Sequence, residues 1–191
     1  PDLQPERSKS YELQWRAQLQ DTRLQAAAFR TDIDDLILLD PFFVAQNISR
    51  ARIHGLELSA ATELAGWQTL LSATWLDPRD RSTGNLLPRR PKRLLSVDAD
   101  RQWGVFGVGF SVMANSERYN DPANQQELAG YGLVEARAHW DMSDAVRWNL
   151  KIGNLLDKEY SVANYNTNGQ TYGYREDDLN AQLSVSWTPA F

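Results

Sequence analysis

The chain has 191 residues, a formal net charge of −5 and no cysteine. Its length suits one folded domain, and an acidic balance without a basic stripe argues against a nucleic-acid binder. The lack of cysteine excludes a disulfide framework, a thiolate metal site and a cysteine nucleophile. No run approaches the roughly 18 apolar residues of a membrane-spanning helix. Since the chain opens at Pro1 without a start methionine or signal peptide, we expect a mature product or a fragment.

The first predicted element covers residues 11–19, where apolar and polar side chains alternate. Tyr11, Leu13 and Trp15 are each separated by one polar residue. A helix would bring Tyr11 beside Gln14 as well as Trp15 and so break the apolar stripe. Period two therefore predicts a β-strand, and a tight turn at 20–23 separates it from a second strand at 24–39.

The same rhythm continues to the end of the chain. It predicts seven further strands, at 48–62, 67–75, 94–100, 105–115, 133–140, 146–154 and 179–187. Short turns at 20–23, 63–67, 100–104 and 141–144 alternate with long polar loops at 40–47, 77–91, 117–130 and 161–178. In an up-and-down sheet all short turns then lie at one end, as in an outer-membrane barrel.

The tryptophans distinguish this barrel from a β-sandwich, which would show the same alternation. Trp67, Trp103 and Trp140 sit beside short turns, with Trp148 and Trp187 a few residues away. Rings gathered near one rim are typical of the aromatic girdle at a lipid–water interface. We therefore predict an all-β, antiparallel up-and-down transmembrane β-barrel segment.

The terminal strand supplies a further signal. Leu183, Val185 and Trp187 alternate with polar residues, and the chain ends at Phe191. We expect the apolar side to face lipid and the strand to pair with the first strand of the barrel, which removes both edges. Trp187 and Phe191 resemble the carboxy-terminal signal by which outer-membrane proteins are recognised for insertion. Pro189 departs from that pattern because it lacks a ladder donor.

Several stretches together resemble the carboxy-terminal part of the barrel of TonB-dependent outer-membrane receptors. They are PDLQPERSKSYEL at residues 1–13, FRTDIDDLI at 29–37, ARIHGLELSA at 51–60 and GNLLDKEY at 153–160. Each match is short, but their order spans nearly the whole chain. The resemblance implies that residues 1–191 are about nine strands of a barrel of ~22, without the plug domain.

The resemblance also implies a function and a location. It implies uptake of a scarce nutrient across the bacterial outer membrane, with no enzymatic activity and no cofactor. The implied partners are outer-membrane lipid, the barrel assembly machinery, a small-molecule nutrient and the TonB complex, which is reached through the absent plug segment. NLLDKEY followed by NYNTNGQTYGY resembles cobalamin receptors, which places a corrinoid first and an iron-siderophore second, although GQTYGYREDDL departs from the common Gly-Arg-x-Tyr.

Four tyrosines in and beside the last long loop are candidate ligand contacts: Tyr160, Tyr165, Tyr172 and Tyr174. Amphipathic rings with neighbouring amides suit a bulky polar ligand, although tyrosine is also ordinary loop surface. For Asn154 and Asp157 we expect hydrogen bonds to the backbone where a strand leaves the membrane.

Other polar residues indicate no chemistry. His54 and His139 have no carboxylate or serine partner at a meaningful spacing, so we expect no metal or catalytic site. Two other classes of protein remain open. One is a self-contained small outer-membrane barrel, either an adhesin or a hydrolase, and the other is a soluble carbohydrate-binding β-sandwich.

Overall fold

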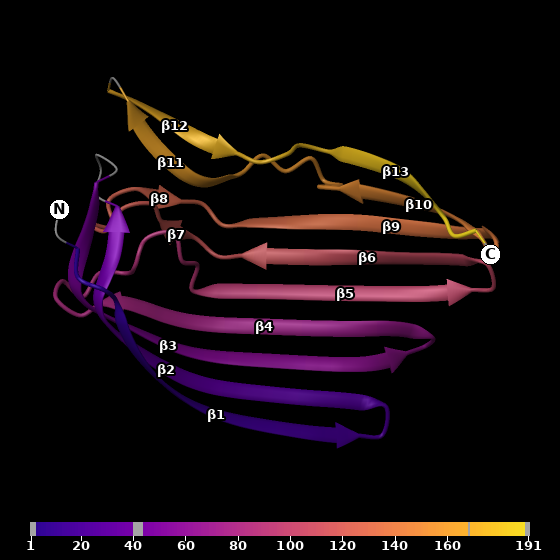
Figure 1. Ribbon diagram of the computed structural model, residues 1–191, viewed down its shortest axis with the longest axis horizontal. Helices are drawn as coiled ribbons and strands as arrows, with labels where there is room; N and C mark the ends of the chain where they lie inside the picture. Colours follow the sequence, from indigo (N-terminus) through magenta and orange to yellow (C-terminus); the bar gives the residue numbers. More distant parts are fainter. Residues whose placement is uncertain (1–2, 40–43, 168, 190–191) are drawn as a thin grey trace.

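The molecule is built around one large antiparallel sheet. The computed structural model describes residues 3–39, 44–167 and 169–189, and in this part of the chain nine strands form a sheet in the order β1-β2-β3-β4-β5-β6-β9-β10-β13 (Figure 1). Their bounds are β1 Arg7–Leu19, β2 Thr22–Leu39, β3 Ala45–Leu64, β4 Trp67–Asp80, β5 Arg93–Trp103, β6 Phe106–Asn115, β9 Tyr131–Ser143, β10 Val146–Gly153 and β13 Asn180–Trp187. The predicted nine-stranded meander is confirmed.

Short turns and long loops lie at opposite ends of this sheet, as the sequence predicted (Figure 1). The turns are tighter than expected, because the strands extend into them until only two residues remain, as at Ala65 and Gly66. Both residues have positive φ, 51° and 79°, which matches the twist of a two-residue hairpin. The turn end is therefore compact, and nearly all irregular chain lies at the other end.

Two of the long loops contain strands of their own, which the sequence analysis did not predict. β7 Arg118–Tyr119 pairs with β8 Glu127–Leu128, and β11 Ser161–Thr167 pairs with β12 Gln170–Arg175. The second pair forms a hairpin that extends beyond the main sheet at its loop end (Figure 1). Polar composition hid this hairpin. Tyr165, Tyr172 and Tyr174 do lie on one face, but the strands are short and lie within a polar segment.

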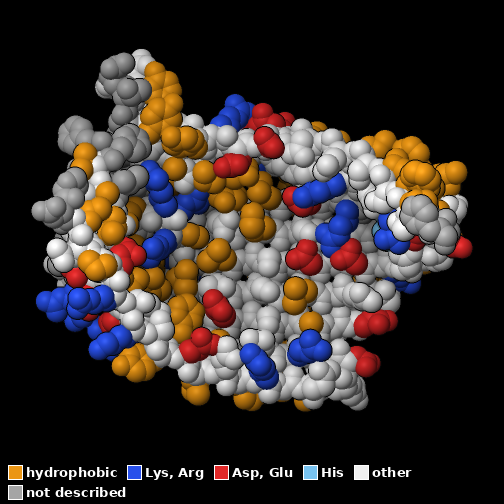
Figure 2. Space-filling view, in the orientation of Figure 1, with side chains coloured by type: hydrophobic (Ala, Val, Ile, Leu, Met, Phe, Trp, Pro, Cys, Tyr) orange, Lys and Arg blue, Asp and Glu red, His pale blue; other side chains and the backbone are white. Residues whose placement is uncertain are grey.

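The main sheet has one apolar and one polar face. On β6, for example, Phe106, Val108 and Phe110 lie on the face that also carries Trp67 and Trp103. The other face, in view in Figure 2, is hollowed and carries Lys, Arg, Asp and Glu side chains along its length. We call these the outer and the inner face. No helical segment among the described residues has the length and apolarity of a transmembrane span.

The buried core is small and lies at the loop end. Leu36, Ala51 and Leu87 form it, with Ile33 and Ile53 packed against them. Leu87 is brought there by the loop after β4, since its N–H donates to the Pro78 carbonyl (2.9 Å). Elsewhere no second layer packs on either face of the main sheet within the described residues, so many large apolar side chains remain exposed. Such an exposed apolar surface indicates contact with lipid or with another protein surface.

Candidate functional site

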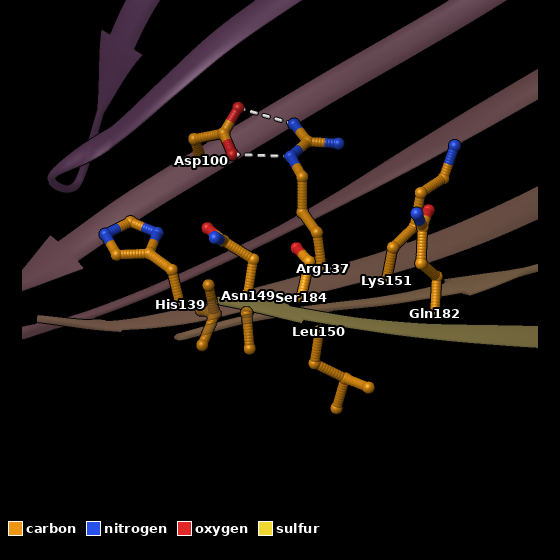
Figure 3. Close-up of a pocket in the computed structure, with 10 residues that line it drawn as sticks. Asp100, Arg137, His139, Asn149, Leu150, Lys151, Gln182 and Ser184 are labelled. Carbon is orange, nitrogen blue, oxygen red and sulfur yellow. Dashed lines mark hydrogen bonds and ion pairs between the residues drawn. The ribbon is translucent and has the colours of Figure 1, made fainter. Parts of the chain in front are cut away.

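The inner face carries an ion-paired network across β5, β6, β9 and β10. Arg137 on β9 donates from Nε and Nη2 to both carboxylate oxygens of Asp100 on β5, at 2.7 and 2.5 Å (Figure 3). Its Nη1 also donates to Ser111 on β6 (2.6 Å), while Lys151 pairs with Glu135 (3.0 Å). Such fork-shaped pairs fix guanidinium orientation. The inner wall is thus a rigid polar surface.

Two glycines leave room for the side chains of the inner wall. Gly107 and Gly109 lie opposite His139 and Arg137 in the β6–β9 register. A Cβ on Gly109 would stand 2.2 Å from Asp100 Oδ1 and 2.7 Å from Arg137 Nε, so any side chain there would displace the pair. His139 lies on the inner wall, and its Nε2 is 4.0 Å from Asp141 Oδ2.

Three of the four tyrosines proposed as ligand contacts do come together. Tyr165 on β11 stands opposite Tyr172 on β12, with ring centroids 5.4 Å apart and planes 19° apart, and Tyr174 lies 5.1 Å from Tyr165. Tyr172 and Tyr174 are 41% and 52% exposed. The hairpin therefore displays a stacked aromatic surface with free ring area for an amphipathic ligand. We call these three residues the tyrosine cluster.

Tyr160 belongs to a different contact. Its ring lies 4.3 Å from that of Tyr131, at the start of β9, and Arg118 lies 5.3 Å over the Tyr131 ring. Arg118 is buried and donates to the Ser161 carbonyl (3.1 Å). Burial, together with the negative charge of Glu176, raises the pKa of the Tyr160 hydroxyl. Tyr160 thus anchors the base of the hairpin, where it is removed from the stacked surface.

Asn120 joins the two long loops, a role that the sequence analysis missed. Its Nδ2 donates to the Asn164 carbonyl (2.8 Å) and its Oδ1 accepts from the Asn164 N–H (2.9 Å). This is the hydrogen-bond pattern of a neighbouring strand, made by one side chain. No signal in the sequence pairs residues so far apart, since an asparagine in a polar loop has many possible partners.

The structural role predicted for Asn154 and Asp157 is confirmed. Asn154 is buried, accepts from the Lys158 N–H (2.9 Å) and donates to the Asp177 carbonyl (3.2 Å). Asp157 accepts from the Leu179 N–H (2.9 Å). Both have positive φ, 47° and 49°, which asparagine and aspartate tolerate better than most residues. They tie together the two ends of the long segment between β10 and β13.

The remaining predicted residues lie apart from the loops. Trp187 is 71% exposed on the outer face at the turn end of β13, whereas Phe191 lies outside the described residues. His54 lies on the outer face of β3. No group of three or more His, Asp or Glu side chains suited to a metal ion occurs within 3–39, 44–167 and 169–189.

A meander with an apolar outer face, a polar inner wall and long loops at one end defines a segment of an outer-membrane barrel. Comparison with known proteins gives the family. The family described as TonB dependent receptor-like, beta-barrel, matches residues 1–155. The chain belongs to this family, whose members are outer-membrane transporters and not enzymes. The hydrolase, adhesin and soluble sandwich alternatives are therefore set aside.

Individual relatives agree with this assignment. The chain is 33% identical over 181 residues to the vitamin B12 transporter BtuB of Vibrio vulnificus and 27% identical to that of Photobacterium profundum, matching 90% of its own length in both. In fold it is similar to the ferric yersiniabactin uptake receptor FyuA from Yersinia pestis, at 20% identity and a TM-score of 0.84 over 95% of the chain. It spans only 28%, 30% and 30% of these three proteins.

Proposed function

We propose that residues 1–191 form the carboxy-terminal wall of a receptor that takes up a corrinoid across the outer membrane. The main support for this proposal is the 33% identity to a protein named vitamin B12 transporter, which extends over 90% of the chain. In this proposal the earlier strands and the plug belong to the rest of the full-length protein, and the TonB complex acts through that plug.

The tyrosine cluster is the part of this chain assigned to ligand contact. Stacked rings with exposed area favour a large, partly apolar ligand with polar edges, and a corrin ring with its amide arms has that chemistry. The buried Arg118 and the paired amide of Asn120 hold the hairpin at its base, so the rings are presented on a fixed support. An iron-siderophore is the second candidate, supported by the fold shared with FyuA.

The first prediction tests the ligand in the full-length parent protein. Replacing Tyr165 and Tyr172 together by alanine removes two aromatic contacts and should weaken cobalamin binding roughly tenfold to a hundredfold, at about 1 kcal/mol or slightly more per ring. Equilibrium binding of radiolabelled cyanocobalamin to outer-membrane preparations measures this. The matched control is Tyr11→Ala, because Tyr11 is an exposed tyrosine on the outer face of β1.

The same preparations decide between the two ligand classes. Tight binding of cobalamin, with none of a ferric siderophore, supports the proposal. Tight binding of a ferric siderophore alone would identify the second candidate as the ligand. Unchanged cobalamin affinity in the double variant would show that the tyrosine cluster does not contact cobalamin.

A further inference from the structure

Two asparagines in one loop bond to the neighbouring loops in the same way. We call residues 81–92 the β4–β5 loop and residues 116–130 the β6–β9 loop. Asn120 pairs with the backbone N–H and carbonyl of one residue in β11. Asn124 repeats this pattern on the other side, because its Oδ1 accepts from the Leu86 N–H (2.8 Å) and its Nδ2 donates to the Leu86 carbonyl (2.9 Å). The β6–β9 loop is therefore bonded to a neighbour on each side.

The turn that carries both asparagines is held by hydrogen bonds of its own. The Asp121 carboxylate accepts from the backbone N–H groups of Gln125 (3.1 Å) and Gln126 (2.7 Å). The Gln126 carbonyl accepts from the Asn120 N–H (2.8 Å). Asn124 has a φ of 57°, which asparagine tolerates better than most residues. Because these bonds fix the turn, a displacement at Asn124 is passed on to Asn120.

The β4–β5 loop supplies a firm support for this turn. Leu87 is 1% exposed and belongs to the buried core at the loop end of the sheet. It directly follows Leu86, the partner of Asn124. A second side chain strengthens the same junction, since Asn85 Nδ2 donates to the Pro122 carbonyl (3.0 Å). The turn of the β6–β9 loop is thus tied to the core of the sheet.

The hairpin β11–β12, in contrast, has little packing of its own. All six residues of β12 are exposed, so apolar burial does not fix the position of this strand. The β6–β9 loop holds the hairpin through Arg118, which donates to the Ser161 carbonyl, and through Asn120. Asn164, the residue paired with Asn120, directly precedes Tyr165. The position of the tyrosine cluster therefore depends on the position of the turn that carries Asn120.

We propose that Asn120 and Asn124 are positioning residues for the ligand, through which the β4–β5 loop holds the tyrosine cluster in place. Within the described residues the Asn124 side chain bonds to no part of the hairpin, so it acts only through the turn. A hairpin that occupies its binding position for only part of the time binds ligand more weakly in proportion. The inference rests on the proposed function for its ligand.

The first experiment measures the hairpin position without ligand in the full-length parent protein. Spin labels at the exposed positions Arg81 and Thr171 report the distance from the β4–β5 loop to the hairpin by pulsed double electron–electron resonance. The double variant Asn85→Ala, Asn124→Ala removes the side-chain bonds of one junction and should broaden the distance distribution. Gln125→Ala is the matched control, because the bonds of Gln125 within the same turn use its backbone N–H.

The second experiment measures binding of radiolabelled cyanocobalamin to the same variants. Asn120→Ala and the double variant at the other junction should each weaken the affinity roughly fivefold. The two junctions act in series on one hairpin, so combining all three substitutions should weaken binding little more than Asn120→Ala alone. Two independent losses would instead multiply to roughly twenty-five-fold.

Three results would overturn the proposal. They are an unchanged distance distribution in the double variant, an equal broadening in Gln125→Ala, and losses of affinity that multiply in the triple variant. If the unsubstituted protein binds no cobalamin, the proposed function fails. The spin-label distances then still decide whether the two junctions fix the hairpin, because they are measured without ligand.

Discussion

At the scale of single residues, one aromatic ring and one glycine show how closely this wall is packed. Phe29 on β2 stands opposite Gly55 on β3. A Cβ built on Gly55 would lie 2.1 Å from the Phe29 Cζ and 2.3 Å from its Cε1. The ring therefore covers the glycine backbone on the inner face, a pairing known to offset the weakness of glycine in a strand.

This contact gives the second prediction. Gly55→Ala should destabilise the protein by about 1–3 kcal/mol, because the added methyl group must push the Phe29 ring off its position. Gly132→Ala is the matched control, since Gly132 also lies in a strand of the main sheet and its Cβ would meet only the Met113 carbonyl oxygen, at 3.6 Å. Urea-induced unfolding of the full-length parent in lipid vesicles measures both. Equal losses of stability in the two variants would contradict the argument.

Residue roles could be predicted from the sequence where they depend on local backbone. Asn154 and Asp157 were assigned to backbone hydrogen bonds because such residues occur at strand ends and positive φ. Roles that depend on register could not be predicted. Lys9, Arg52 and Arg79 lie in one row only once three strand pairings are fixed, and the sequence shows them as isolated charges.

At the scale of whole elements, alternation carried most of the information. The nine main strands were predictable because each must present an apolar side to one environment and a polar side to another. The hairpin β11–β12 is not predicted because its strands are short, with six residues in β12, and their tyrosines alternate with polar or small residues inside a polar segment. The sequence therefore predicts these tyrosines as residues of a polar loop. It does not predict that their rings stack across two paired strands.

The third prediction tests which face meets lipid. Phe110→Lys on β6 should cost about 2–4 kcal/mol if the site lies near the bilayer midplane, with less toward the rims. Asn149→Lys on β10 should cost far less, because Asn149 lies on the inner wall opposite His139. Spin labels at Val108 and Asn149 check the facing directly. Higher oxygen accessibility at position 149 than at 108 in bilayers would reverse it.

At the scale of the whole molecule, the sheet has two outer edges, β1 and β13. β13 is held on one side by β10, from Val146 opposite Trp187 to Gly153 opposite Asn180. Its other side has no strand partner among the described residues. Unpaired backbone groups cannot be left in lipid, so both edges of the sheet need further strands as partners in a closed barrel.

The last prediction concerns the terminal strand in the full-length parent. If Trp187 and Phe191 form the assembly signal, deleting Phe191 should leave the translated protein in the periplasm, because an unclosed edge prevents stable insertion. Deleting the hairpin between Ser161 and Arg175 is the contrasting control. Its strands form a separate sheet, so that variant should still reach the outer membrane. Immunoblots of fractionated membranes measure both variants. Normal insertion without Phe191, with only a lower melting temperature, would contradict this prediction. Phe191 would then be a residue of the aromatic girdle, and β13 alone would close the barrel.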